Sequence, residues 1–540
     1  MRRILLAACA VGVFAAATAT SVAADPSDRT GGSGYDAVLA QYAAQAVHWS
    51  ECHPGQGTPE FQCATLHTPE DWSNPRLGDL DLSISRIKAG QPRNRRGVLL
   101  LNFGGPGIGG VSGPAYMVPA EPDVAAVYDM IGFDPRGVDS SSALECADPA
   151  ILDHGYSLDG RDTSPANTAE FLKVSRQFGQ ACSHNARTQY ITTDQTVRDM
   201  DLIRAVLGER KISYLGYSAG TWLGAWYATV FPDRTDRFAL DGNVDWTSTW
   251  ADWAGRQAKA FQERYEQDFI PWLARYDSQY HLGATPTRVK ASLEAIRASV
   301  QAHPLVVSPG IKINGSVFDF GVGSGMYSSS SFPDITYSIL TLQHWATANQ
   351  DDRDYASQVW FYAGSIGHAD DPFYTIICQD TRTPSDAVVI ANWLRDRTRY
   401  SLTGASFIDP CLYWTTPPIG SPVTGRDLPP MLMVANDHDP ATPYEGAVQA
   451  HRDDPTSTLI TVRHEGGHTA YGGGLSCVDD TVNAWLIRGT MPRHDISCEG
   501  FGLPDPTAAA SASSRGSALV ATSSPVGGTP YLLARAAARR

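Results

Sequence analysis

The sequence has 540 residues, of which 42% are hydrophobic and 18% are charged. This composition excludes wholesale disorder, and the absence of any Gly or Pro period excludes a collagen-like chain. The 57 acidic and 42 basic residues give a net charge of −15, and a chain this acidic is not expected to bind nucleic acid. At roughly 100–200 residues per domain, the length allows two or three domains, or one large core with a long insertion.

The N-terminus has the pattern of a secretory signal. Residues 1–3 are a short basic start, residues 4–17 are apolar or small, and residues 22–24 are small. We therefore expect residues 1–24 to be a signal peptide that is removed on export. A transmembrane anchor and a cell-surface lipoprotein attached at Cys9 are the alternatives, but the apolar run is short for either. No later stretch reaches the roughly 18 apolar residues that a membrane span needs.

The cysteines agree with export. Eight follow the signal, and an even count in a secreted chain indicates disulfides. The simplest pairing joins sequence neighbours: 52 with 63, 146 with 182, 378 with 411 and 477 with 498. A zinc site is the alternative, but the sequence has no CxxC pair.

Buried apolar runs alternate with helical patterns after a leader over residues 25–45, which we expect to be loosely held. The expected strands are 80–87, 98–103, 127–133, 212–215, 237–241, 431–435 and 458–462. The expected helices are 197–207, 218–231 and 478–487. Continuous apolar strands that alternate with helices predict a parallel sheet covered on both faces.

The alternation stops between residues 243 and 428. This stretch is rich in Trp, Tyr, Asp and Ser, with helical patches at 253–269 and 286–300. We expect a mainly helical unit inserted into a sheet domain that is built from residues 46–242 and 429–504. Residues 505–540 are rich in Ala, Ser and Gly, which predicts a disordered or trimmed tail.

The strongest local motif is Gly216-Tyr217-Ser218-Ala219-Gly220, which lies between an apolar run and a helical pattern. GxSxG between a strand and a helix is typical of a nucleophile elbow, whose sharp turn lifts the serine hydroxyl out of the sheet. The helix N-terminus and the Ala219 amide would then face developing negative charge. We therefore expect Ser218 to be a catalytic nucleophile, with an ordinary helix-capping serine as the alternative.

A glycine-rich segment, residues 103–107, follows an early strand. Glycine lets the backbone approach a substrate, and Pro106 stiffens the loop without an N–H of its own. The second oxyanion donor of such folds comes from this kind of loop, so we expect the amides of Gly105 and Ala219 to form the oxyanion hole. A plain glycine turn and a phosphate loop are the alternatives, and the second lacks the Gly-Lys-Ser/Thr ending.

The acid and the base of a triad are expected after two late strands, in the order Ser, acid, His. Asp437 and Asp439 follow the first of these strands, and both are candidates. His464 and His468 follow the second. We expect His468 to be the base, because it lies in a glycine-opened loop while His464 is still at the strand end. This chemistry needs no cofactor, and none is expected.

The segment His464-Glu465-Gly466-Gly467-His468 also matches the HExxH pattern of zinc proteases. That motif works only on a helix, where both histidines share a face. Adjacent glycines and a β-branched run before them make a helix unfavourable here. We therefore expect no metal site.

Together these motifs resemble the secreted actinobacterial tripeptidyl aminopeptidases, α/β-hydrolases related to proline iminopeptidases. The resemblance covers the chain from about residue 45 to about residue 500. It rests on residues 102–107, 132–137, 192–193, 198–204, 216–220, 378–380, 439–443 and 467–468, and on Cys477 and Cys498.

The resemblance implies an α/β-hydrolase fold in which the inserted unit is a lid. It implies Asp439 rather than Asp437 as the acid, and a cleft that admits only the free N-terminal end of a peptide. A lid carboxylate would bind the substrate ammonium, with Asp380 as the first candidate and Glu263 and Glu266 behind it. The alternative is that all three are solvated acidic side chains at the protein surface.

Two positions depart from the family pattern. Ala219 follows the nucleophile where many relatives carry Tyr, and Ile377 stands where some relatives carry Glu. The departures predict a first subsite of different shape and an ammonium contact that is missing or moved.

We therefore expect a secreted, monomeric serine exopeptidase that releases short peptides, with tripeptides expected, from free N-termini of peptides or proteins. The alternative enzyme is an esterase or amidase with the same triad, which predicts no dependence on a free α-amine. A binding protein that keeps the fold without turnover would need a broken triad, and no member is missing.

Overall fold

The computed structural model describes residues 33–52, 60–308, 311–364, 370–402 and 409–506. The expected signal peptide and almost all of the expected tail lie outside these residues. All four disulfides expected from sequence neighbours are present: Cys52–Cys63, Cys146–Cys182, Cys378–Cys411 and Cys477–Cys498. Among the described helices, none is long and apolar enough to cross a bilayer.

A ten-stranded sheet forms the centre of the molecule, with strand order β1-β2-β3-β5-β4-β6-β7-β10-β11-β12. The strands are β1 (Ser50–Glu51), β2 (Gln62–Pro69), β3 (Asp79–Ile87), β4 (Gly97–Asn102), β5 (Tyr128–Phe133), β6 (Ile212–Tyr217), β7 (Thr235–Asp241), β10 (Met431–Asn436), β11 (Thr458–Arg463) and β12 (Ile496–Glu499). The strands from β5 to β12 in that order pair in parallel, and β1, β2 and β3 are antiparallel. The prediction of a mostly parallel sheet is confirmed.

Each strand expected from an apolar run overlaps one of these strands. No apolar run predicted β1, β2 or β12, which lie at an edge of the sheet or next to one. β2, for example, alternates buried and exposed residues along its second half. An edge strand faces solvent more, so its sequence lacks the continuous apolar run of the centre.

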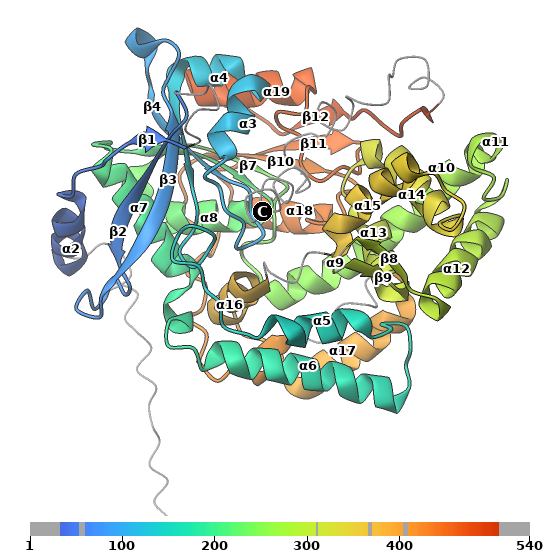
Figure 1. Ribbon diagram of the computed structural model, residues 1–540. Helices are drawn as coiled ribbons and strands as arrows, with labels where there is room; N and C mark the ends of the chain where they lie inside the picture. The colour runs from blue at the N-terminus through green and yellow to red at the C-terminus, as the bar shows by residue number, and fades with distance from the viewer. Residues whose placement is uncertain (1–32, 53–59, 309–310, 365–369, 403–408, 507–540) are drawn as a thin grey trace, which may run out of the picture.

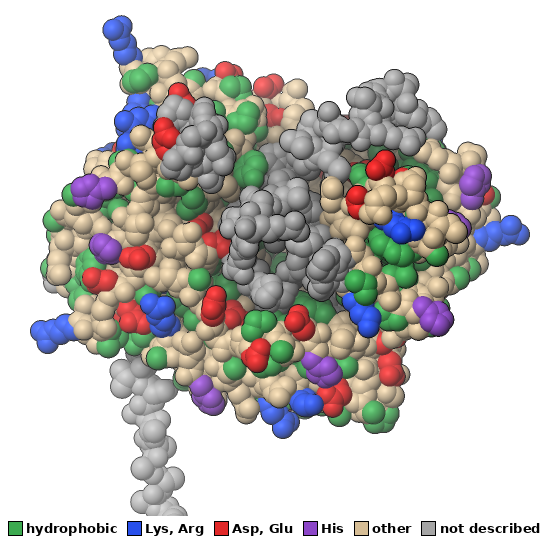
Figure 2. Space-filling model, in the orientation of Figure 1, with side chains coloured by type: hydrophobic (Ala, Val, Ile, Leu, Met, Phe, Trp, Pro, Cys, Tyr) green, Lys and Arg blue, Asp and Glu red, His purple; other side chains and the backbone are tan. Residues whose placement is uncertain are grey.

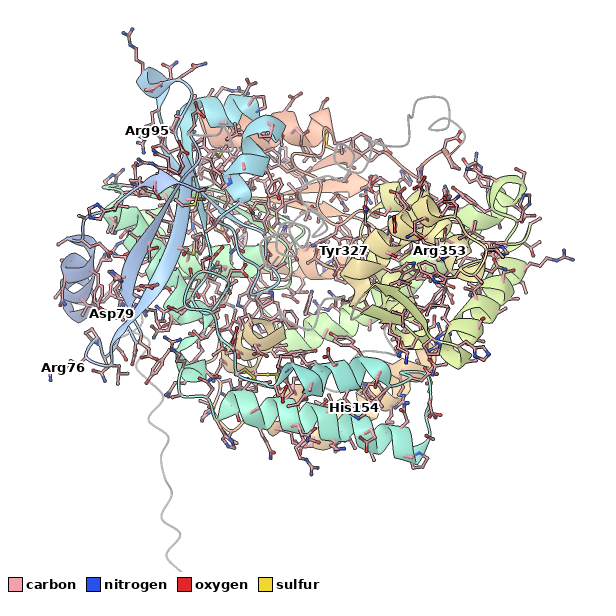
Figure 3. All side chains as sticks on the ribbon, viewed as in Figure 1. Arg76, Asp79, Arg95, His154, Tyr327 and Arg353 are labelled. Carbon is pink, nitrogen blue, oxygen red and sulfur yellow. A yellow bond between two sulfur atoms is a disulfide. The ribbon has the colours of Figure 1, made fainter. Side chains whose placement is uncertain are left out.

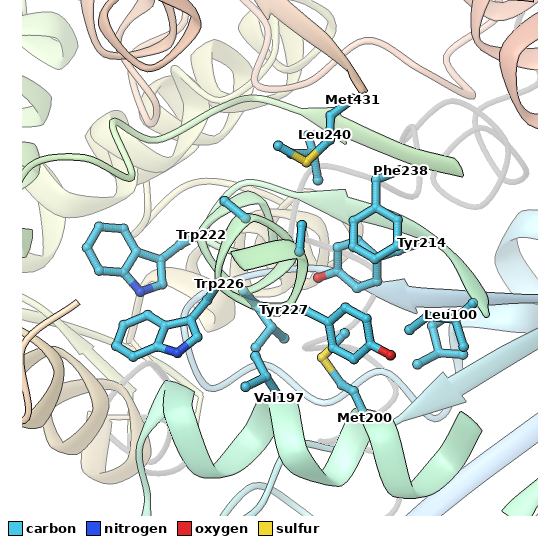
Figure 4. Packing of buried hydrophobic residues seen from close by; sticks show 14 of the residues in the cluster. Leu100, Val197, Met200, Tyr214, Trp222, Trp226, Tyr227, Phe238, Leu240 and Met431 are labelled. Carbon is cyan, nitrogen blue, oxygen red and sulfur yellow. The ribbon is translucent and has the colours of Figure 1, made fainter. Parts of the chain in front are cut away.

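Helices cover both faces of the sheet. On one face lie α7 (Thr193–Val206) and α8 (Gly220–Val230), and on the other α3 (Gly113–Ala120), α4 (Pro122–Val127) and α19 (Ser476–Asn483). Alternate residues of each strand point to opposite faces, so one strand supplies both cores. Figure 4 shows Trp222, Trp226 and Tyr227 of α8 in the same buried cluster as Val197 and Met200 of α7.

Helices also make up most of the segment between β7 and β10. It contains α9 (Trp250–Arg264), a π-helical turn (Tyr265–Phe269), α10 (Ile270–Arg275), α11 (Asp277–Tyr280), α12 (Pro286–Ala302), α13 (Gly315–Gly325), α14 (Phe332–Gln343), α15 (Gln350–Gly364), α16 (Asp370–Asp380) and α17 (Asp386–Arg399), with the hairpin β8 (Leu305–Ser308) and β9 (Ile311–Ile313). A separate hydrophobic core holds most of it together. We call this segment, residues 243–428, the lid.

Two further helices join the lid from an earlier part of the chain. They are α5 (Pro149–Ser157) and α6 (Pro165–Ser183), which lie with α17 along the bottom of Figure 1. Phe171 packs on Trp393, and Asn314 donates to the Tyr156 carbonyl. The sequence placed these helices with the sheet domain, whereas in the structure they pack against the lid.

The described part of the expected leader begins at residue 33. Residues Ser33–Ala43 form helix α2, and the Tyr35 hydroxyl donates to Asp201 of α7 over 2.9 Å. Leu39 is buried in a small core with Trp72. This part of the leader is held against the sheet domain and is not loose, a correction that aromatic anchoring by Tyr35 explains.

The described surface is mixed. On the face seen in Figure 2, acidic and basic side chains are interspersed, with hydrophobic side chains scattered between them. Such a surface is ordinary for a globular protein.

A buried ion pair connects the antiparallel edge to the parallel centre. Arg136, after β5, donates to both carboxylate oxygens of Asp199 on α7 over 2.7 and 2.6 Å, and both side chains are fully buried. Asp199 also accepts from Thr68 and from the Trp72 indole. The pair therefore fixes β2, β5 and α7 relative to one another.

We predict that Arg136→Met lowers the free energy of unfolding by about 3–5 kcal/mol, because it leaves the buried Asp199 carboxylate without its cation. Denaturant unfolding with the disulfides intact measures this. Arg95→Met is the matched control, since Arg95 pairs with Asp129 and Glu209 at the surface and is expected to cost about 1 kcal/mol or less. Equal losses in the two variants would contradict the prediction.

Candidate active site

Ser218 lies in a strained turn between the end of β6 and the start of α8. Its φ is +55°, in the left-handed region that residues with a side chain seldom adopt. The flanking glycines make the turn feasible: a Cβ on Gly216 would lie 2.6 Å from the Gly220 carbonyl oxygen, and one on Gly220 would lie 2.7 Å from Asn102 Oδ1. The geometry is that of a nucleophile elbow, with the serine at the N-terminus of an 11-residue helix.

The glycine-rich loop after β4 touches this turn. A Cβ on Gly104 would lie 2.8 Å from the Ala219 nitrogen, so only glycine allows the two backbones this close. The Gly104 amide donates to Asn102 Oδ1 over 3.0 Å. Among the described residues the amides of Gly105 and Ala219 have no hydrogen-bond partner.

Asp439 and His468 form a buried pair. His468 Nδ1 lies 2.9 Å from Asp439 Oδ2 and 3.1 Å from Oδ1, and both residues are almost fully buried. Asp439 also accepts from the amides of Ala441 and Thr442. The other acid candidate, Asp437, accepts instead from the amides of His464 and Glu465, so Asp439 is the carboxylate that orients the His468 imidazole.

The loops that carry Ser218 and His468 meet at the end of β7. The Ser218 amide donates to the Asp241 carbonyl over 2.8 Å. A Cβ on the next residue, Gly242, would lie 3.1 Å from His468 Cε1. Within the described residues, neither the Ser218 hydroxyl nor His468 Nε2 makes a hydrogen bond. Catalytic hydrogen bonds in ligand-free structures are often long and tighten only with substrate bound.

The lid contacts the imidazole directly. The His468 amide donates to the Tyr327 carbonyl over 2.7 Å, and the two rings meet edge to face with centroids 5.6 Å apart. Tyr327 is labelled in Figure 3, where the lid meets the sheet domain. The buried Arg264 of α9 donates to the Met326 carbonyl and to Ser329, and also to Asp268. Burial lowers the pKa of Arg264, although Asp268 and Glu465 oppose this effect.

The HExxH segment does not form a metal site. It follows β11 as a loop, with His464 exposed and paired to Glu499 over 3.0 Å. Glu465 is buried and accepts from the amides of Gly467 and Phe501. Among the described residues, the groups close enough to hold a metal are two disulfides, each with one aspartate.

The three expected ammonium ligands all have partners among the described residues. Asp380 is fully buried and accepts from the Thr193 amide and hydroxyl over 2.9 and 2.6 Å, and from Trp250. Burial raises the pKa of Asp380 to about 6, and the bonds from Thr193 oppose this. Glu263 pairs with Lys259 and Glu266 with Lys290 on the lid surface. These contacts give each carboxylate a partner within the protein, so we expect structural roles for all three.

Several residues that shape the site escaped the sequence patterns. Asp241, at the end of a buried strand and before Gly242, had a recognisable signal, because polar residues at the ends of parallel strands face the site edge. Asn436, at the end of β10, had the same signal. Tyr327 had none, since nothing in the lid sequence places one tyrosine against the base.

Comparisons with known proteins decide the family. Residues 97–299 match the family model described as alpha/beta hydrolase fold, and residues 401–498 match the model described as TAP-like protein. A tripeptidyl aminopeptidase from Streptomyces lividans is 32% identical, with 87% of this chain and 90% of the relative covered. The chain belongs to the tripeptidyl aminopeptidase family. It is an α/β-hydrolase and a serine hydrolase.

Two other relatives have different names. The serine protease Hip1 of Mycobacterium tuberculosis is 29% identical, over 84% of this chain and 91% of the relative. A protein of the same organism named carboxylesterase B is 31% identical, over 85% of this chain and 91% of the relative. Members of the family thus have both peptidase and esterase names.

We predict that Asp380→Asn alters how the free energy of unfolding depends on pH, compared with the wild type, and leaves the catalytic rate unchanged. The wild-type carboxyl holds its proton to about pH 6 when folded but ionises near 3.8 when unfolded, so wild-type stability falls as pH rises through that window. The variant lacks this loss, and its free energy of unfolding relative to wild type is expected to rise by about 3 kcal/mol between pH 4 and pH 7.

Denaturation at the two pH values measures this, with Glu263→Gln, at a position on the lid surface, as the control variant. A large rise in KM for peptides with a free N-terminus, in Asp380→Asn alone, would contradict the structural role.

Proposed function

We propose that this chain is a secreted serine exopeptidase that releases short peptides, with tripeptides expected, from the free N-termini of peptides or proteins. The observation that carries the proposal is the juxtaposition at the carboxyl edge of the sheet. Ser218 has a strained backbone at a helix N-terminus, the next amide, that of Ala219, has no hydrogen-bond partner within the described residues, and the loop of the buried Asp439–His468 pair is tied to the same strand end.

In the proposed reaction, the Ser218 hydroxyl attacks the peptide carbonyl and His468 takes its proton. Asp439 holds the imidazole with Nδ1–H toward the carboxylate and stabilises the imidazolium. The amides of Gly105 and Ala219 bind the oxyanion of the tetrahedral intermediate. His468 then protonates the leaving amine. Water next attacks the acyl-enzyme while His468 takes a proton from it, and the short peptide is released.

The lid supports the exopeptidase reading. It contacts the base through Tyr327 and packs on the glycine-rich loop, where a Cβ on Gly107 would lie 3.1 Å from the Phe373 nitrogen of α16. A site with walls this close to the nucleophile favours a chain end over the middle of a chain. The names of the relatives from Streptomyces and the protease Hip1 favour a peptide substrate.

Export is the second element of the proposal. Four disulfides are typical of proteins that fold in an oxidising compartment. The basic and apolar N-terminal residues fit a secretory signal. Peptides outside the cytoplasm are therefore the substrates we propose.

An esterase or amidase is the second candidate function. The relative named carboxylesterase B is 31% identical to this chain and favours it. The same triad would attack an ester of a small exported compound, and no free amine would be needed.

We predict that a tripeptide anilide is hydrolysed when its N-terminus is free and that N-acetylation lowers kcat/KM by about 100-fold or more. Acetylation removes the ammonium charge, which leaves the group that binds it unpaired. Release of the chromogenic amine measures both rates. Equal rates for both forms, or faster turnover of a short-chain ester than of either peptide, would favour the esterase reading.

We also predict that Ser218→Ala lowers kcat by more than about 1,000-fold for every substrate that the wild type cleaves, because the nucleophile is lost. Ser73→Ala, at an exposed turn, is the matched control and is expected to keep full activity. Activity retained in Ser218→Ala would sink the proposed mechanism.

A further inference from the structure

Asp241 binds both catalytic loops at once. It is the last residue of β7, which lies between β6 and β10 in the sheet. Its carbonyl accepts from the Ser218 amide over 2.8 Å. Its carboxylate Oδ2 accepts from the amides of Ala470 and Tyr471 over 2.8 and 2.7 Å. One residue therefore holds the nucleophile turn through its backbone and the base loop through its side chain.

The segments that Asp241 holds are both strained. Ser218 has φ +55°, and Thr469, directly after His468, has φ +68°. A β-branched residue in this region is a genuine outlier that persists only where its surroundings enforce it. Asn436 Nδ2 enforces it from one side by donating to the carbonyls of Gly467 and Thr469. Asp241 enforces it from the other by capturing the two amides that follow Thr469.

The Asp241 carboxylate is poorly satisfied for a buried group. Oδ1 is buried and has no hydrogen-bond partner. Burial raises the pKa of Asp241 to about 7, nearby Asp439 adds to the rise, and the two amides and His468 oppose it. Tyr217 is also close: burial raises its pKa, and the charge of Asp241 adds to the rise. A buried polar atom left without a partner needs a reason, and function is a common one.

We propose that Asp241 is a positioning residue for the hydrolytic reaction: it sets the placement of His468 relative to Ser218 by holding the strained turn at Thr469. The inference rests on the proposed roles of Ser218 and His468. Asp241 touches no substrate in this account and acts through the two loops that it binds.

Two variants at this position separate the acceptor from the charge. Asp241→Ala removes the acceptor for both amides, so Thr469 can relax and turn the imidazole. We expect kcat to fall by about 100-fold or more, with KM within about threefold of wild type. Asp241→Asn keeps an oxygen acceptor of the same shape, and we expect it to retain kcat within about tenfold.

A matched control separates positioning from stability. Asp454 is also a fully buried aspartate with one unpartnered oxygen, and it accepts from the amide of Thr456 at the other end of β11. Asp454→Ala is expected to lower thermal stability while kcat stays within about twofold. A loss of kcat as large as that of Asp241→Ala would overturn the positioning role.

Rescue supplies the sharpest test. Glycine adopts φ +68° without a Cβ penalty, so Thr469→Gly removes the tendency of the turn to relax. In the Asp241→Ala background, Thr469→Gly is expected to restore kcat by about tenfold or more. A merely structural role predicts that the two losses add, and additive losses would overturn the proposal.

All variants are assayed as full chains on both a tripeptide anilide and a small p-nitrophenyl ester. If the wild type cleaves only the ester, the exopeptidase function fails while the ester rates still test Asp241. The proposal is overturned if Asp241→Ala keeps wild-type kcat on every substrate that the wild type cleaves, or if Asp241→Asn loses as much as Asp241→Ala. A wild type that cleaves neither substrate overturns the proposed function and, with it, this inference.

Discussion

The active site depends on the parallel hydrogen bonding of β6, β7, β10 and β11. Because these strands run in one direction and pair in that order, their carboxyl ends lie at the same edge, where the loops with Ser218, Asp439 and His468 follow β6, β10 and β11. Tyr217 pairs with Asp241 in register, so the elbow starts where β7 ends. A slip in this register would move Ser218 away from the pair of Asp439 and His468.

Glycine sets how closely the loops approach. Gly104, Gly216 and Gly220 each lie where a Cβ would come within 3 Å of neighbouring backbone or side-chain atoms. Polar side chains at the strand ends then hold the loops: Asn102 is the last residue of β4, Asp241 of β7 and Asn436 of β10. The lid adds a further contact, since the buried Arg264 donates to the Met326 carbonyl and the next residue, Tyr327, contacts His468.

Much of this was predictable from the sequence, for physical reasons. The central strands are buried on both faces, so continuous apolar runs located β4, β6, β10 and β11 closely. The elbow was recognisable because a sharp strand-to-helix turn requires small residues at fixed positions. The disulfide pairing followed sequence neighbours, and all four pairs are present.

Other features depend on tertiary contacts that no local pattern encodes. Asp380, expected as an ammonium ligand, accepts hydrogen bonds from Thr193 and Trp250, which are both distant from it in sequence. Helices α5 and α6 belong beside the lid although the chain reaches them before the elbow. The contact of Tyr327 with His468 joins residues 327 and 468 across the two units, and only the folded chain reveals it.

The most direct test of the account is to identify the residue that a fluorophosphonate modifies. The full chain would be treated with the reagent, digested and mapped by mass spectrometry, with His468→Ala treated in parallel. The account predicts a single adduct on Ser218, formed in the wild type and lost or strongly slowed in His468→Ala. An adduct on another residue, or equal labelling of Ser218 in the two proteins, would contradict it.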